Sequence, residues 1–222
     1  MQALPIVLPF MGNKPIIIDG GANIGQTVRS YLSVRVQSRI HAFEPGPAAF
    51  DMLQKQGFGP QVVLNRLALS DFDGEAEFHS NEGPSEVASL LQRVDGVKCC
   101  PLTQSFKVPC ARLDSYAEAA RLEHIDVLKL DLQGGELRAL KGAERLFREK
   151  RVDVVVCEVW YVPSYDGAPY YWEIGEFLQR SGFRTWYIDT VVYQDLNEGR
   201  WGDAVYVRAD VLKSTFNLEF SC

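Results

Sequence analysis

The strongest constraint on the fold is a set of short apolar runs in which apolar and polar residues do not alternate. Residues 16–18 (Ile-Ile-Ile) and 154–156 (Val-Val-Val) are the clearest examples. A strand covered on one face alternates, whereas a strand buried on both faces, as in a parallel sheet, is apolar throughout. Segments with helical periodicity separate these runs. The sequence therefore predicts an α/β class fold, a Rossmann-like, doubly wound, mostly parallel sheet.

The expected strands and helices follow each other along almost the whole chain. Strands are predicted at residues 15–19, 39–43, 62–67, 125–132, 152–160, 185–192 and 204–207, and helices at 25–32, 48–56, 113–121, 136–149 and 172–181. The turn at 195–199, which contains Asn197 and Gly199, predicts an antiparallel hairpin that finishes the sheet.

One stretch departs from this rhythm, at about residues 71–110. Its short alternating pieces at 75–79 and 105–109 predict a small antiparallel ribbon, with a loop at 80–103 between the two arms. Because neither a repeat nor a linker divides the sequence, we expect residues 1–222 to form a single domain.

Composition excludes several classes of protein. The chain has 222 residues, of which 46% are hydrophobic and 23% charged, as in an ordinary globular domain. Its net charge of −6 and pI of about 5.2 lack the basic character of a nucleic-acid-binding surface. We therefore expect a small-molecule partner and no nucleic acid.

Cysteines and apolar segments indicate the compartment. The five cysteines are odd in number and form no CxxC pair, so neither a disulfide framework nor a zinc site is expected. No apolar run approaches the roughly 20 residues of a membrane helix. Pro5 and Pro9 break the apolar N-terminus, which no basic segment precedes. These features predict a cytoplasmic protein without a membrane partner.

A glycine-rich turn follows the first predicted strand, in the sequence IIIDGGANIG at 16–25. The dinucleotide fingerprint GxGxxG does not fit, because Ala22 and Asn23 stand where its second glycine is needed. The carboxylate of Asp19 suits a ligand with a cationic amine and would repel a pyrophosphate. The alternative is a structural turn without a ligand.

An acid also ends the second predicted strand, where Glu44 precedes Pro45. A carboxylate at this tip can accept both ribose hydroxyls of an adenosine. Ser70 and Asp71 follow the third strand, where the exocyclic amine of an adenine would lie. Together these segments favour an adenosine-containing ligand over a plain structural turn.

Two further acids lie at or near strand ends. Asp131 closes a strand and precedes Gln133-Gly134-Gly135. Ligands bind at the carboxyl ends of parallel strands, which favours a functional role for Asp131. It could instead cap the helix that starts near Glu136. Glu158 follows an apolar run, where a carboxylate is costly unless it is paired. It could be a base, a ligand contact or a structural acid.

Aromatic residues are dense in the segment 161–172. We predict that Tyr161, Tyr165 and Tyr170 contact an acceptor substrate as part of a lid, with Glu158 beneath them. The alternative is an aromatic cluster packed over the sheet without a ligand.

Five motifs in order carry a resemblance to a known family. They are IIIDGGANIG, HAFEP, NRLALSDFDGEAEF, ARLDSY and DVLKLDLQGGELRALKGAERLF. With them the chain, from about residue 15 to 208, resembles the FkbM-type methyltransferases, a branch of the class I enzymes that use S-adenosyl-L-methionine. The resemblance implies a seven-stranded sheet with an antiparallel last strand. It also implies O-methylation of a hydroxyl on a sugar or a secondary metabolite.

The resemblance also assigns roles to residues. The turn residues would surround the methionine part of the cofactor, Glu44 would hold the ribose, and Asp131 would face the methyl-transfer region. Gln133 stands where the family has an acid or a glutamine. The predicted cofactor site comprises Asp19, Gly20, Gly21, Asn23, Gly25, Glu44, Pro45, Ser70, Asp71 and Asp131.

Several alternatives stay open for the chemistry. Asp131 and Glu158 are the predicted catalytic residues; His79 is a further candidate base, and His124 precedes a strand at the wrong end. A divalent metal held by the two acids is a less favoured alternative, so no metal site is predicted. A non-catalytic nucleotide- or cofactor-binding module and an NAD-dependent oxidoreductase are the competing functions. The missing GxGxxG and Tyr-x-x-x-Lys patterns argue against the oxidoreductase.

Overall fold

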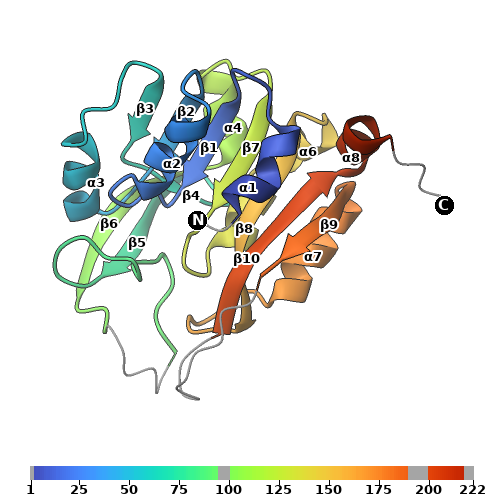
Figure 1. Cartoon of the computed structure of the whole chain (residues 1–222). Helices are drawn as coiled ribbons and strands as arrows, with labels where there is room; N and C mark the ends of the chain where they lie inside the picture. The colour runs from blue at the N-terminus through green and yellow to red at the C-terminus, as the bar shows by residue number, and fades with distance from the viewer. Residues whose placement is uncertain (1–2, 95–100, 190–199, 218–222) are drawn as a thin grey trace.

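A seven-stranded sheet forms the centre of the protein (Figure 1). The computed structural model describes residues 3–94, 101–189 and 200–217. The strand order is β3-β2-β1-β7-β8-β10-β9. The strands are β1 (Ile16–Gly20), β2 (Arg39–Phe43), β3 (Val62–Asn65), β7 (Ile125–Leu130), β8 (Val152–Val162), β9 (Phe183–Ile188) and β10 (Arg200–Arg208).

The pairing of these strands confirms the predicted topology. β1 is parallel to β2 and β7, β2 is parallel to β3, and β7 is parallel to β8. β10 is antiparallel to both β8 and β9. The predicted antiparallel pairing at the end of the sheet is confirmed, and the connecting turn at 195–199 lies outside the described residues.

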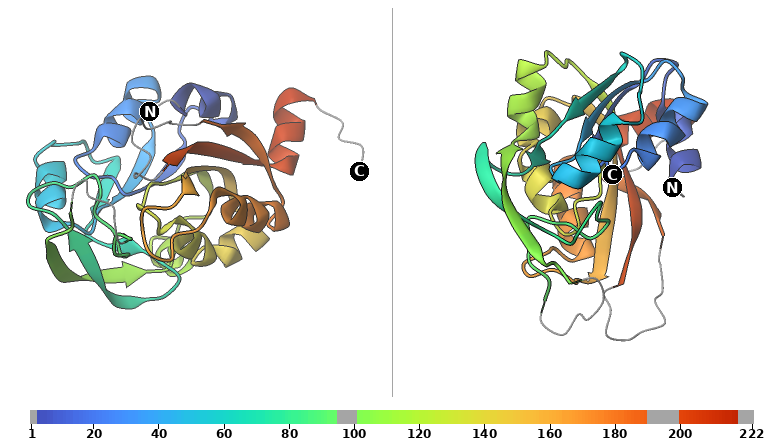
Figure 2. Two further views of the ribbon diagram at one scale, coloured as in Figure 1. Left: turned by 90° about the horizontal axis from the view of Figure 1, so that it is seen from below. Right: turned by 90° about the vertical axis from the view of Figure 1, so that its left-hand side faces the viewer.

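Helices cover both faces of the sheet (Figure 2). They are α1 (Leu4–Val7), α2 (Gln26–Val34), α3 (Pro47–Gln54), α4 (Leu113–Ala119), α5 (Glu136–Lys141), α6 (Glu144–Arg148), α7 (Tyr171–Arg180) and α8 (Ala209–Phe216), with a short 3₁₀ turn, η1 (Leu8–Phe10). Side chains of α4 to α7 share one buried cluster, and side chains of α1, α2, α3 and α8 share the other.

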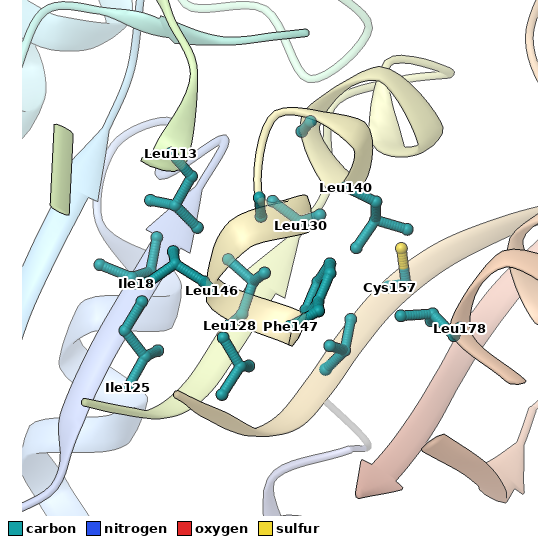
Figure 3. Packing of buried hydrophobic residues seen from close by; sticks show 14 of the residues in the cluster. Ile18, Leu113, Ile125, Leu128, Leu130, Leu140, Leu146, Phe147, Cys157 and Leu178 are labelled. Atoms are coloured by element: carbon teal, nitrogen blue, oxygen red, sulfur yellow. The ribbon is translucent and has the colours of Figure 1, made fainter. Parts of the chain in front are cut away.

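The two clusters explain why the apolar runs do not alternate. Ile17 packs in the cluster that includes Tyr31 of α2, while its neighbour Ile18 packs in the cluster that includes Leu113 and Leu146 (Figure 3). Successive side chains of a strand point to opposite faces, and both faces are covered here. Apolar residues are therefore favoured at successive positions of these runs.

The insertion forms a second, smaller sheet. β5 (Gly74–Ser80) and β6 (Gln104–Ala111) are antiparallel, as predicted, and β4 (Ala68–Leu69) adds to β6 in parallel. The predicted strand at 62–67 therefore ends early, at Asn65, because the chain leaves the main sheet and joins the small one at Ala68.

Other predicted boundaries also differ from the structure. The expected helix at 136–149 is two helices, α5 and α6, separated at Gly142. A Cβ atom at Gly142 would overlap the carbonyl oxygen of Ser70, so the break brings the small sheet close to this turn. The short helices α1 and α8 were not predicted. None of the helices in the described ranges is long and apolar enough to cross a membrane.

Candidate active site

A cavity of about 340 Å³ lies at the carboxyl edge of the sheet, within the size range of small-molecule sites. The turn after β1, the end of β2 and the end of β7 line it on the side of the sheet. Residues of the insertion, including Phe78, Ala88 and Leu90, supply an apolar wall. This is the edge at which ligands bind in open parallel sheets.

The glycine turn has the backbone conformation that its composition predicts. Gly21 has a φ of 76°, and a Cβ atom there would overlap the carbonyl oxygen of Asp131. Gly25 precedes α2 with a φ of 91°, also in the left-handed region. The turn after β1 therefore packs directly against the end of β7, and only glycine fits at position 21.

Glu44 connects the end of β2 to this turn. One carboxylate oxygen accepts the backbone N–H of Asn23 at 2.9 Å, and the other accepts the N–H of Gly46 at 2.7 Å. Burial raises the pKa of Glu44 to about 7, although these two backbone donors act in the opposite direction. A carboxylate has about four acceptor positions, so both oxygens keep capacity for a ligand at the cavity.

An ion pair lies behind the turn. The Nζ atom of Lys129 is 3.3 Å from Oδ1 of Asp19 and 3.5 Å from Oδ2 of Asp131. Burial raises the pKa of Asp19 above its ordinary value, and Lys129 limits that rise. Burial disfavours the ammonium, but the two carboxylates outweigh it and raise the pKa of Lys129. Sequence reasoning missed Lys129, although a lysine within an apolar parallel strand was a usable signal.

Asp131 and Glu158 lie close together but in different surroundings. The side chain of Asp131 is 43% exposed and lines the cavity. Glu158 is buried and does not line it. Burial, with Asp131 and Glu136 nearby, raises the pKa of Glu158 well above its ordinary value. The amide of Gln133 donates to both carboxylates, at 2.9 Å to Asp131 and 3.1 Å to Glu158.

Asp203 of β10 is a second cavity residue that sequence reasoning missed. It lines the cavity together with Asp131 and Lys129. Burial and the charge of Asp131 raise its pKa above the ordinary value. It lies in register with Glu158 of β8, and the available sequence signal was an acid directly before the apolar run at 204–207.

Some predicted cofactor residues lie away from the cavity surface. Ser70 and Asp71 follow β4 and do not line the cavity; the backbone N–H of Ser70 donates to Ala111. Leu67, Ala68 and Leu69 line it in their place. Gly21, Asn23, Glu44 and Pro45 line the cavity, whereas Asp19, Gly20 and Gly25 do not.

The three predicted acceptor tyrosines have different surroundings. Tyr165 is 1% exposed, and its hydroxyl lies 2.9 Å from the side-chain oxygen of Gln133. The hydroxyl of Tyr161 donates to the carbonyl of Asp189. Tyr170 is 40% exposed and stacks on Trp172. None of the three lines the cavity. For Tyr165 this placement favours the packed alternative.

The histidines lie outside the cavity. His79 pairs through its backbone with Ser89 and does not line the cavity. His124 lies just before β7, at the opposite end of that strand from Asp131, as expected. It contacts Asp153 at 2.9 Å, and with Asp126 these two form a group of possible metal-ligand atoms within 4.8 Å. Arg208 also lies 3.0 Å from Asp153, which adds a competing positive charge.

Comparisons with known proteins identify the family of this chain. The profile of the methyltransferase FkbM domain matches residues 19–185. The 2-O-methyltransferase NoeI of Sinorhizobium fredii is 28% identical over 148 residues, which cover 62% of this chain and 60% of that protein. The hexuronic acid methyltransferase AglP of Haloferax volcanii is 28% identical over 160 residues, covering 71% and 61%. The chain thus spans about three fifths of these relatives.

Solved structures share the fold. The methyltransferase FkbM of Methylobacillus flagellatus superposes with a TM-score of 0.56 at 16% identity, covering 89% of this chain and 44% of that one. Magnesium protoporphyrin IX methyltransferase of Synechocystis, solved with bound S-adenosylmethionine, gives 0.53 at 8% identity, covering 94% and 77%. On the match over residues 19–185, this chain belongs to the FkbM methyltransferase family.

Proposed function

We propose that this protein binds S-adenosyl-L-methionine in the cavity and transfers its methyl group to a hydroxyl of a small-molecule acceptor. The observation that carries the proposal is the convergence of Asn23, Glu44 and Asp131 on one cavity. They come from the tips of three adjacent parallel strands, which form the ligand-binding edge of such sheets.

The residues present fit this cofactor. Glu44 and Asp131 supply carboxylate at two places in the cavity, which suits the cofactor's ribose hydroxyls and its cationic groups. The side-chain oxygen of Asn23 is buried and has no hydrogen-bond partner among the described residues. A buried unpaired acceptor at a cavity wall is satisfied by a ligand donor. The apolar wall of Phe78, Ala88 and Leu90 suits the face of an adenine ring.

The chemistry asks little of the protein beyond alignment. When bound, S-adenosylmethionine supplies an activated methyl group on a sulfonium. The chain has to orient the acceptor hydroxyl in line with that group and accept its proton. Asp131 suits the base role better than Glu158, because it faces the cavity while Glu158 is buried and has a raised pKa.

The acceptor we propose is a sugar or a secondary metabolite that carries a free hydroxyl. Support comes from relatives whose names state 2-O-methylation and methylation of a hexuronic acid. The net charge of −6 is unfavourable for binding nucleic acid. We also propose a single domain over residues 1–222 and a cytoplasmic location, the latter because Cys110 and Cys157 are free buried thiols.

Binding and turnover test the proposal separately. Calorimetry with S-adenosylmethionine, S-adenosylhomocysteine and NAD should show binding of the first two only. NAD binding alone would favour an oxidoreductase. A mass-shift screen of hydroxylated acceptors should then detect a methylated product. Binding without a product in any extract or panel would favour a non-catalytic cofactor-binding module.

Asp131→Asn tests the catalytic part. This variant should keep the fold and lose most turnover, because the amide can no longer accept a proton. Either full activity or loss of folding in this variant would indicate that the role of Asp131 is structural.

A further inference from the structure

We propose that Gln133 is a positioning residue, whose side-chain amide holds the Asp131 carboxylate at the cavity by bridging it to the buried Glu158. The inference rests on the proposed cofactor site, because it takes Asp131 as a contact of that ligand. Gln133 itself lines the cavity beside Asp131.

The bridge is made by one nitrogen atom. Nε2 of Gln133 lies 2.9 Å from Oδ1 of Asp131, and 3.2 and 3.1 Å from the two oxygens of Glu158. An amide nitrogen carries two hydrogens, so one bond to each acid uses both. Two acids that would otherwise repel each other are thus joined through a neutral donor.

The other end of the amide contacts a buried tyrosine. Oε1 of Gln133 lies 2.9 Å from the hydroxyl of Tyr165, a side chain that is 1% exposed. The same hydroxyl lies 2.9 Å from the carbonyl oxygen of Val87, so its one hydrogen is shared between two acceptors. A flipped amide would place its oxygen against two carboxylates and lose the bonds to both. The two acids therefore set the orientation of the amide, and the contact with Tyr165 is compatible with it.

The backbone around Gln133 is held as firmly as its side chain. Gln133 has a φ of 52°, in the left-handed region, and its carbonyl accepts the hydroxyl of Ser89 at 2.8 Å. On either side, the N–H groups of Leu132 and Gly134 donate to one carboxylate oxygen of Glu136. These contacts over-determine an unfavourable backbone conformation, which is typical of functional sites.

The charges around the bridge favour a neutral donor. The ionisable groups near its residues come from several elements. They are Asp19 on β1, Lys129 and Asp131 at β7, Glu136 on α5, Glu158 on β8, Tyr165 after β8, Asp203 on β10, and Arg93, whose guanidinium lies 4.9 Å from the centre of the Tyr165 ring. Carboxyl groups outnumber cations in this set, so a carboxylate at position 133 would add to their repulsion.

Two variants separate positioning from packing. Gln133→Leu removes both ends of the bridge, and Gln133→Glu keeps the shape but replaces the donor with an acceptor. We expect the Kd for S-adenosylmethionine to rise about tenfold in Gln133→Leu, with the ratio to wild type unchanged between about pH 6 and pH 8.5. In Gln133→Glu the ratio should be at least as large at the high end and fall at the low end without reaching 1, because a protonated glutamic acid regains one of the two donors.

The comparison is made by calorimetry, with each variant divided by wild type at the same pH so that titration of Glu44 cancels. Gln54→Leu, the same chemical change at the exposed end of α3, is the matched control and should bind as wild type. Thermal melting of each variant reports whether the fold is kept. A Gln133→Leu affinity within about twofold of wild type would overturn the inference, and so would a Gln133→Glu ratio that does not change with pH.

A further variant tests the inference if the Gln133 variants do not fold. Tyr165→Phe keeps the buried ring and removes the hydroxyl that contacts the amide oxygen of Gln133 and the carbonyl oxygen of Val87. It should weaken binding by about threefold, and an unchanged Kd would contradict the inference. Failure of the wild-type protein to bind S-adenosylmethionine would instead overturn the proposed function, and the positioning role with it.

Discussion

The ammonium of Lys129 lies 3.3 Å from the carboxylate of Asp19, and both side chains are buried behind the glycine turn. Apart from this ion pair, neither carboxylate oxygen of Asp19 has a hydrogen-bond partner among the described residues. A buried charge that loses its counter-ion is far more costly than an exposed one. The stability of the domain therefore depends on an ion pair that lies directly behind the glycine turn after β1.

Replacing Lys129 with Met should lower the free energy of unfolding by about 3–5 kcal/mol, because Asp19 would stay buried without its cation. Denaturant unfolding at neutral pH measures this loss. The double variant Lys129→Met/Asp19→Asn is the control and should recover part of the stability, since it removes both charges. A single-variant loss below about 1 kcal/mol would show that the pair is solvated.

Replacing Gly21 with Ala should destabilise the protein by more than about 2 kcal/mol and abolish cofactor binding. The new Cβ would overlap the carbonyl oxygen of Asp131, and the φ of 76° is strained for alanine. Gly12→Ala is the matched control, because a Cβ there meets nothing within 4 Å. Its unfolding free energy should stay within about 0.5 kcal/mol of wild type. Equal melting temperatures for both variants would contradict the close packing of β1 and β7.

Glu44 should make stability pH-dependent. Its pKa rises from 4.5 to about 7 on folding, so the folded state holds a proton that the unfolded state has released between these values. Stability therefore falls as the pH rises through this window. Glu44→Gln should remove this contribution to the slope, measured as the difference between variant and wild type in unfolding curves. Identical slopes would mean that Glu44 is ionised throughout.

The same carboxylate should control cofactor affinity in the opposite sense. The ionised form is the better acceptor for ribose hydroxyls, so affinity for S-adenosylmethionine should weaken as the pH falls below about 7. Glu44→Gln should bind more weakly at high pH, by about 1.5–3 kcal/mol, and show less pH dependence in calorimetry. Unchanged affinity in a folded variant would remove Glu44 from the site.

Of the three tyrosines in the predicted lid, Tyr165 and Tyr170 should differ in their contribution to stability. Tyr165→Ala removes a buried ring and should cost about 3–5 kcal/mol of stability. Tyr170 is 40% exposed, so Tyr170→Ala should cost less than about 1 kcal/mol. If Tyr170 contacts the acceptor, its variant should raise the acceptor KM without changing cofactor affinity. An unaltered KM would leave the segment as a packed aromatic cluster.

The sequence by itself determined which segments form strands and in what succession they follow along the chain. Runs such as Ile16 to Ile18 are apolar throughout because each residue faces one of two covered sheet faces, and that pattern is local. The acid at each strand tip could likewise be predicted, since a parallel sheet brings its carboxyl ends together. Glu44 and Asp131 were found in this way, and both line the cavity.

Only the tertiary structure decided which polar residues meet. Lys129 precedes Asp131 closely in the chain, but its partner Asp19 lies on another strand, and Asp203 reaches the cavity from the antiparallel strand β10. Ser70 was predicted to contact the cofactor, but the chain joins the small sheet at Ala68, and Ser70 is buried and does not line the cavity. Periodicity reports which residues are buried, because burial follows from the face of a single element. Contacts between distant elements depend instead on strand order, register and loop path, which no local pattern encodes.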